Sequence, residues 1–259
     1  LVVSAGWGGY DYFVRHARNP DDPGLAYAFE GAQLIEAIEI NQFLGTGWQG
    51  TGIREPAPSP IPGRHVYLAP RMWEDRHAVN LLVASPQRIS ILGRDPRVEA
   101  DQALALVWPY GDVNSVRQVL PTPATITVTK GPLERGDLDP EPRLLYVAFR
   151  ANQQIDTLTV VAQFEQGIEL LNWTVGPTPE GETRLDLYWR AEQPLSTDYT
   201  VFVHLERDGT IVAQQDGTPG RGYYPTTWWR PGDHIVDTHY LYISFVDTYR
   251  LWRSEEHTS

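Results

Sequence analysis

The chain has 259 residues and a formal net charge of −12, from 21 basic and 33 acidic side chains. This charge argues against a nucleic-acid partner and against electrostatic docking on anionic lipid. The absence of cysteine excludes disulfides, thiolate metal sites and cysteine nucleophiles. A hydrophobic content of 41% is typical of a folded chain, and the length allows one large domain or two ordinary ones.

The two ends of the sequence predict a fragment of a longer reading frame. Residues 1–9 contain neither a methionine nor a signal-peptide pattern. Their apolar start fits the end of a truncated membrane helix and, equally, an ordinary buried strand or frayed end. Residues 253–259, RSEEHTS, are the translation of AGATCGGAAGAGCACACGTCT, a common sequencing adapter, so we exclude them from the fold prediction as an artefact. No apolar run approaches the roughly 18 residues of a membrane span.

Helices and strands alternate through the first 120 residues. Apolar residues at helical spacing predict helices over 10–18, 25–44 and 71–84. Glu36 and Glu39 are expected on the outer face of the second of these helices. Apolar runs predict strands over 65–69, 88–92 and 103–108, and Asp112 is a suitable N-cap for a short helix over 113–120. This alternation favours an α/β domain with a mostly parallel sheet, which we assign to residues 10–150.

From residue 123 onward the pattern is that of strands alone. Strands are predicted over 125–129, 144–149, 185–190 and 199–205. In the third of these, Leu185, Leu187 and Trp189 alternate with polar residues, as in a strand with one buried face. Asp208-Gly209 predicts a hairpin turn, and Pro231-Gly232 predicts a second turn before another strand. We therefore predict an all-β antiparallel β-sandwich over residues 151–252.

The same strand-rich region carries a series of motifs in a fixed order. They are YWRA (188–191), PLSTDYTVFVHL (194–205), DGTIVAQQDGTP (208–219), YPTTWWRPGD (224–233) and VD (236–237). The series resembles a β-sandwich module near the C-terminus of bacterial membrane glycosyltransferases of the protein O-mannosyltransferase and aminoarabinose-transferase group. Two upstream segments, YDYFVRHARNP…AYAFEG (10–31) and HVYLAPRMWEDRHAVNLLV (65–83), resemble the region after the last membrane helix and the first strand–helix pair of the soluble α/β domain in that group.

The resemblance implies a function for the parent protein rather than for this piece. Members of the group transfer sugar from a polyprenyl-phosphate donor, and their catalytic acids lie in the membrane region, so no catalytic residue carries over to this sequence. We expect these domains to lie on the extracytoplasmic face of the cell membrane, where they position acceptor or stabilise the membrane region of the same chain. The fragment itself is expected to be soluble. The alternative is a secreted or cell-envelope carbohydrate-binding β-sandwich protein.

Aromatic residues are the enriched class, with 9 tryptophans and 13 tyrosines. Four of them cluster in the segment GYYPTTWW and are the candidate carbohydrate-binding residues: Tyr223, Tyr224, Trp228 and Trp229. Flat aromatic faces suit the apolar C–H face of a sugar ring. The competing interpretation is that one member of each pair packs into the core, because neighbouring side chains of a strand point to opposite sides. Trp173 and Trp189 are expected in the core.

Other kinds of site have weaker support. The glycine-rich segment 45–52 follows a predicted helix, whereas a dinucleotide fingerprint follows a strand, so we predict a connector and no cofactor. Asp216, Asp233 and Asp237 could line a calcium site, but solvated turn carboxylates are the more ordinary interpretation, and we predict no metal. Glu165, Glu169 and Glu182 are expected on the surface. A soluble enzyme would need a pocket lined by residues such as Trp73, His77 and Tyr110.

Overall fold

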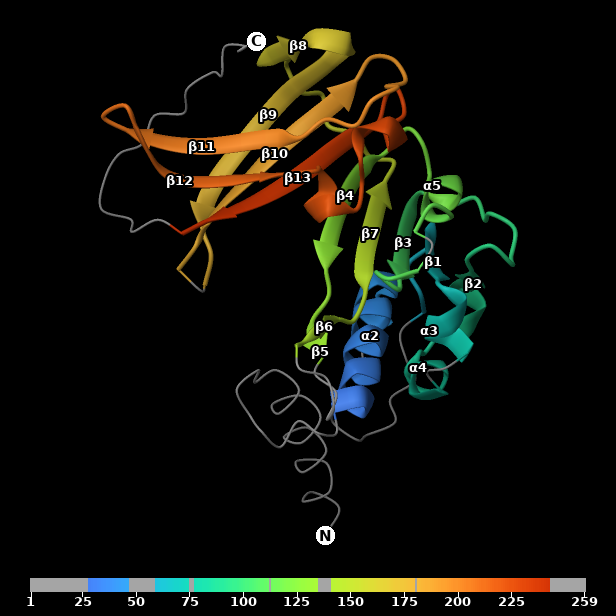
Figure 1. The fold of residues 1–259 in the computed structure, drawn as a ribbon. Coiled ribbons are helices and arrows are strands. Elements are labelled where there is room, and N and C mark those ends of the chain that lie inside the picture. The colour runs from blue at the N-terminus through green and yellow to red at the C-terminus, as the bar shows by residue number, and fades with distance from the viewer. Residues whose placement is uncertain are drawn as a thin grey trace. The chain divides into compact units, whose positions relative to one another are not determined.

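The computed structural model describes residues 28–46, 59–74, 77–111, 113–134, 141–179 and 181–242. The chain divides into two compact units, residues 1–155 and 156–259, here called the N-terminal and C-terminal units (Figure 1). The predicted domain boundary at 150/151 lies five residues before this division. The helix predicted over 10–18, most of the connector at 45–52 and the tail 253–259 lie outside the described residues.

Strands of the N-terminal unit follow the order β2-β1-β3-β7-β4. Their bounds are β1 Arg64–Leu68, β2 Ile89–Ile91, β3 Gln102–Val107, β4 Thr125–Lys130 and β7 Val147–Asn152. The pairs β1–β2 and β1–β3 are parallel, whereas β3–β7 and β4–β7 are antiparallel. The N-terminal unit is thus mixed α/β, and the predicted mostly parallel sheet is confirmed only for the first three strands.

A short hairpin explains why the second half of this sheet is antiparallel. The chain leaves β4 through β5 (Leu133–Glu134) and returns through β6 (Arg143–Leu144), which pairs antiparallel with β5. A parallel return needs a crossover of a dozen or more residues, usually a helix. The segment between β4 and β7 forms this hairpin instead of a crossover helix, so β7 runs back beside β4.

Helix α2 (Ala28–Leu44) confirms the helix predicted over 25–44, and it ends at Gly45, whose φ of 74° is left-handed. Its apolar residues Ala37, Ile40 and Leu44 belong to a buried cluster with residues of β1 and β3. The outward placement of Glu36 and Glu39 was wrong. Glu36 is 1% exposed, and Glu39 accepts hydrogen bonds from Arg150 and Tyr146. Both polar and apolar side chains of α2 therefore point toward the rest of the protein.

The remaining helices are shorter than predicted. Within the helix expected over 71–84 the structure describes α3 (Pro70–Glu74) and α4 (His77–Leu82), and residues 75–76 between them lie outside the described residues. Helix α5 (Val116–Val119) begins after Ser115, which occupies the cap position without a side-chain cap hydrogen bond. Among the described residues, no helix is both long and apolar enough to cross a membrane.

The C-terminal unit contains two antiparallel groups of strands. The first has the order β13-β10-β9-β8, and the second is the hairpin β11–β12. The bounds are β8 Ala162–Phe164, β9 Ile168–Pro177, β10 Thr183–Ala191, β11 Val201–Arg207, β12 Thr210–Gly217 and β13 His234–Leu241. The all-antiparallel pairing agrees with the sequence pattern, whereas no clear sandwich is evident, and the sandwich stays a prediction.

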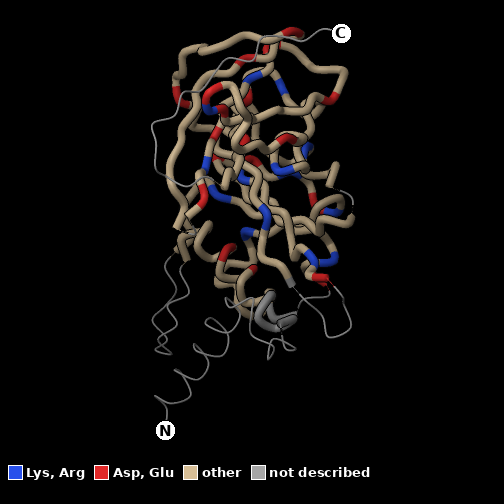
Figure 2. The backbone as a smooth tube through the Cα atoms, turned by 60° about the vertical axis from the view of Figure 1, so that its left-hand side comes forward, with Lys and Arg blue, Asp and Glu red and all other residues tan. Residues whose placement is uncertain are grey.

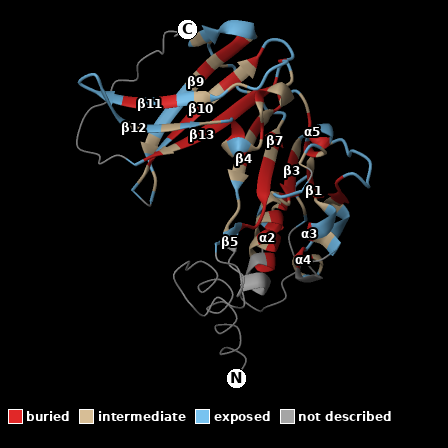
Figure 3. Cartoon of the chain, in the orientation of Figure 1, coloured by how far each residue is buried: buried red, intermediate tan, exposed pale blue. Residues whose placement is uncertain are grey.

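Predicted turns and alternation are found where the sequence placed them. The hairpin turn has positive φ at both Asp208 (51°) and Gly209 (75°), as the tight turn between twisted strands requires. In β10, Leu185, Leu187 and Trp189 are all buried. Strand β13 is buried on both faces except at Tyr240 (Figure 3). Figure 2 shows acidic and basic residues interspersed along the backbone of each unit.

Two burial predictions on β9 were wrong. Trp173, expected in the core, is 39% exposed, although Leu187 opposite it on β10 is buried. The short strand β8 pairs only with Ile168–Leu170, so among the described strands β9 is an edge strand beyond that point. Glu169, expected on the surface, is buried where β8 does pair, and its carboxylate accepts from Arg190 Nη2 at 2.5 Å.

Candidate functional site

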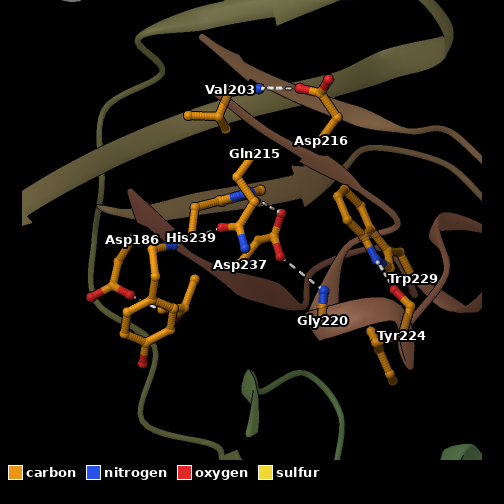
Figure 4. A network of polar contacts seen from close by, with 11 residues as sticks. Asp186, Val203, Gln215, Asp216, Gly220, Tyr224, Trp229, Asp237 and His239 are labelled. Carbon is orange, nitrogen blue, oxygen red and sulfur yellow. Dashed lines mark hydrogen bonds and ion pairs between the residues drawn. The ribbon is translucent and has the colours of Figure 1, made fainter. Parts of the chain in front are cut away.

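The segment between β12 and β13, residues 218–233, contains all four predicted carbohydrate-binding residues and is here called the aromatic loop. One end of it is fixed by a buried carboxylate on β13 (Figure 4). The Gly220 amide donates to Asp237 Oδ1 at 2.9 Å, and Asp237 Oδ2 lies 2.8 Å from His239 Nε2. Asp237 and His239 are both buried, so the carboxylate is shielded from water and satisfied by protein groups.

The middle of the aromatic loop is fixed to the segment that precedes β11. Thr226 Oγ1 donates to the Thr197 carbonyl at 3.0 Å and accepts from the Tyr199 amide at 2.9 Å. The Thr227 amide donates to Asp198 Oδ1 at 3.0 Å. These bonds join two of the motifs, LSTDY and YPTTWW. The order of the motifs thus reflects a pair of segments that are far apart in sequence and bonded in the fold.

The aromatic pairs each divide between buried and half-buried side chains. Tyr224 and Trp229 are 0% and 1% exposed, and Trp229 Nε1 donates to the Tyr224 carbonyl at 3.3 Å (Figure 4). Tyr223 and Trp228 are half-buried. The Trp228 ring meets Tyr224 edge-on, with 5.8 Å between centroids. Tyr224 and Trp229 present no ring face to a ligand, which corrects their assignment as sugar-binding residues; Tyr223 and Trp228 stay predictions.

Sequence reasoning missed Arg221 as a site residue. Its backbone is left-handed, with φ 60° and ψ 24°, between Gly220 and Gly222, which also have positive φ. Its guanidinium carbon lies 4.7 Å from the centroid of the Tyr240 ring, within the range of a cation–π contact. The available signal was the GRG tripeptide itself, because a large residue between two glycines of a tight turn is unusual there.

Three arginines of the C-terminal unit meet carboxylates: Arg184 with Asp186, Arg190 with Glu169, and Arg230 with Asp233. The Arg230–Asp233 pair is the most enclosed, with side chains 16% and 0% exposed, and in the Arg190–Glu169 pair the Glu169 side chain is 2% exposed. Burial acts to raise the pKa of Glu169, but hydrogen bonds from Gln163 and Arg190 and the Arg190 charge outweigh it, so the pKa is lowered. Burial and the nearby Arg190 charge lower the pKa of His234. Glu169 is therefore the ionised partner of a structural ion pair.

The structure does not bring together the three acids that were considered for calcium. Asp216 Oδ1 accepts from the Val203 amide at 3.3 Å and lies 3.3 Å from His204 Nε2. Asp233 accepts from Arg230 at 2.7 Å, and Asp237 is engaged with Gly220 and His239. Within the described ranges, no three histidine or acidic side chains are grouped as metal ligands. The ordinary interpretation, solvated turn carboxylates, is wrong for Asp233 and Asp237, which are 1% and 2% exposed.

Trp73 and Tyr110, two of the residues considered for an enzyme pocket in the N-terminal unit, have different surroundings. Tyr110 is exposed, and its hydroxyl accepts from the Leu144 amide at 3.0 Å. Trp73 packs at the edge of the buried cluster around α2, and the side chain of His77 lies outside the described residues. A different polar pair is buried on this sheet, with His65 Nε2 2.8 Å from Ser90 Oγ. Burial and the nearby Arg88 charge lower the pKa of His65, which favours the neutral ring.

No family profile, curated protein or solved structure matches this chain.

Proposed function

We propose that the chain is the extracytoplasmic C-terminal part of a polytopic membrane glycosyltransferase that uses a polyprenyl-phosphate sugar donor. In this proposal the two units do not make or break bonds. They position the acceptor or stabilise the membrane region of the same parent chain, and they belong on the extracytoplasmic face of the membrane.

One observation carries the proposal: residues of the different motifs make hydrogen bonds to one another. Thr197 and Tyr199 of one motif bond Thr226 of another, and Asp237 of the last motif holds Gly220. Residues that make hydrogen bonds within the fold identify a structural module, and they do not identify the reaction of the parent protein. The motif series therefore supports the assignment of the C-terminal unit to the β-sandwich module of the resembled glycosyltransferases. The position of that module near their C-terminus supports the proposed positioning or stabilising role.

The acids of the C-terminal unit support a positioning role in a second way. Glu169, Asp186 and Asp237 are buried, and each accepts hydrogen bonds from other side chains or from the backbone. A general acid needs access to substrate and a raised pKa, whereas these carboxylates are enclosed and the pKa of Glu169 is lowered by its donors and by the Arg190 charge. Glu169, which was predicted on the surface, forms an ion pair with Arg190.

The test begins with the upstream reading frame from the same DNA. Several apolar spans of about 18 residues or more, with acidic residues in the first outward loop, are expected before residue 1. A short signal peptide, or an initiator methionine near residue 1, would contradict the proposal. The assay that follows compares sugar transfer by membranes carrying the whole parent protein with transfer by the purified 259-residue chain, which is expected to show none. Turnover by the isolated chain would also contradict it.

A secreted or cell-envelope carbohydrate-binding protein is the second candidate. It is favoured by one observation, that Tyr223 and Trp228 are half-buried in a loop that hydrogen bonds hold at several points. A fixed loop keeps aromatic rings in place, which lowers the entropy cost of binding a sugar. This candidate predicts glycan affinity that falls on Trp228→Ala without unfolding. Equal affinity of that variant and the parent would count against it.

A further inference from the structure

Arg221 is held differently from the arginines that pair with acids in the same unit. Arg184, Arg190 and Arg230 each lie within 3.0 Å of a carboxylate oxygen. Arg221 has no ion pair among the described residues, and the ring of Tyr240 is its partner instead. Arg221 as a residue is half-buried. In a chain of net charge −12, this is a cation held against an aromatic ring, and no acidic side chain of the described ranges pairs with it.

The fold alone does not favour an arginine at this position. The left-handed backbone of Arg221 suits glycine, and a side chain with a Cβ atom adopts it at a cost. Backbone conformations of this kind are found preferentially where a ligand is held. The residue in the left-handed turn therefore has a role that its backbone does not explain.

The turn around Arg221 is rigid. The Gly220 amide donates to Asp237, the Gly222 amide donates to the Thr218 carbonyl at 3.0 Å, and the Tyr223 amide donates to the Gly220 carbonyl at 3.0 Å. The turn fixes the backbone of Arg221 and the Tyr240 ring holds its guanidinium, so less side-chain entropy is lost when an anion binds. Asp237, the acid that contacts this turn, is already satisfied by Gly220 and His239.

We propose that Arg221, with Tyr223 and Trp228 of the same loop, binds a sugar that carries an anionic group, a carboxylate or a phosphate. The planar guanidinium binds either oxyanion through paired N–H donors, and the aromatic side chains contact the C–H face of the sugar ring. The inference rests on the proposed carbohydrate-binding role of the aromatic loop, and it names the class of ligand.

The test is isothermal titration of the 259-residue chain at constant ionic strength with four probes: glucose, glucuronate, glucose 1-phosphate and inorganic phosphate. At least one anionic sugar is expected to bind about tenfold more tightly than glucose and than phosphate, because only it engages both the cation and the rings. The two anionic sugars show which oxyanion the site takes.

Variants separate the charge from the backbone. Arg221→Gly removes the guanidinium at a position whose φ suits glycine, and it is expected to lower the affinity for the anionic sugar about tenfold while the chain stays folded. Gln166→Gly is the matched control, because Gln166 has a φ of 61° and lies on the turn before β9. It relieves a left-handed backbone elsewhere and should leave binding unchanged. Arg221→Lys keeps the charge without the planar fork and should be intermediate.

Each other outcome identifies what has failed. Unchanged binding by Arg221→Gly overturns the inference. Equal binding of all sugars, lost in Trp228→Ala but not in Arg221→Gly, retains carbohydrate binding and overturns the role of Arg221. Equal binding of phosphate and glucose 1-phosphate overturns the sugar part. No binding of any probe overturns the inference together with the carbohydrate-binding candidate, whereas the membrane glycosyltransferase proposal is decided separately by the upstream reading frame.

Discussion

Removal of the Asp237 carboxylate should release the aromatic loop from β13. Asp237→Ala leaves the Gly220 amide without its acceptor and His239 without its neighbour, in a place where both Asp237 and His239 are buried. Hydrogen bonds to a charged group contribute about 1.5–3 kcal/mol each, and unpaired buried donors add a desolvation cost. We expect the free energy of unfolding to fall by about 3 kcal/mol, allowing for partial relaxation of the loop.

The assay is urea unfolding followed by tryptophan fluorescence, since Trp229 lies in the same loop and is buried. With an m-value of about 2 kcal/mol/M, the midpoint should fall by roughly 1.5 M. Asp237→Asn keeps an oxygen acceptor for Gly220 and should cost about 1 kcal/mol. Glu206→Ala removes an exposed acid from β11 and serves as the control, with an effect within about 0.5 kcal/mol. If Asp237→Ala matched that control, the loop would not depend on this carboxylate and the reasoning would be refuted.

Three further predictions concern other contacts. Arg190→Met should lower the free energy of unfolding by about 3 kcal/mol because it leaves Glu169 buried and charged. The double variant Arg190→Met/Glu169→Leu should unfold near the parent midpoint of urea unfolding. A double variant as unstable as the single one would contradict this. The lowered pKa of His65 means that folding favours the neutral ring. Its contribution to the free energy of unfolding is complete above the unfolded pKa, about 6.5, and is lost as the pH falls through the lower folded pKa. Urea midpoints at pH 7.5 and 5.5 should therefore differ less in His65→Gln than in the parent. Gly131→Ala would place its Cβ 2.7 Å from the Tyr146 ring and should cost about 1–3 kcal/mol by overpacking, seen as a lower melting temperature.

Local signals in the sequence predicted much of the secondary structure. The Asp208-Gly209 turn has the positive φ angles that its residues allow, and the apolar alternation of β10 gives its buried face. Helix α2 follows from its apolar spacing and its glycine stop. These features depend on neighbours within a few residues along the chain, which is why a single sequence shows them.

The candidate site could be predicted only as a segment. The cluster of four aromatic residues was evident, but which ring of each pair is buried depends on where the loop is bonded. Tyr224 and Trp229 point inward because Thr226 and Gly220 are held by partners 29 and 17 residues away in sequence. Arg221 was missed because its left-handed backbone and its contact with Tyr240 are properties of the folded loop.

The sequence by itself determined the places of most strands, the positions of the turns and the order of the motifs, because backbone preferences and apolar periodicity act over short distances. It did not determine strand lengths: the strand predicted over 144–149 is divided between β6 and β7, and β10 is longer than the predicted 185–190. Tertiary structure decided the direction of β7, the exposure of Trp173 and the burial of Glu169. Each of these depends on which strand lies alongside: β8 covers the first part of β9 and leaves the rest as an edge. Burial of a side chain is set by neighbours that are distant in sequence, and no local pattern specifies them.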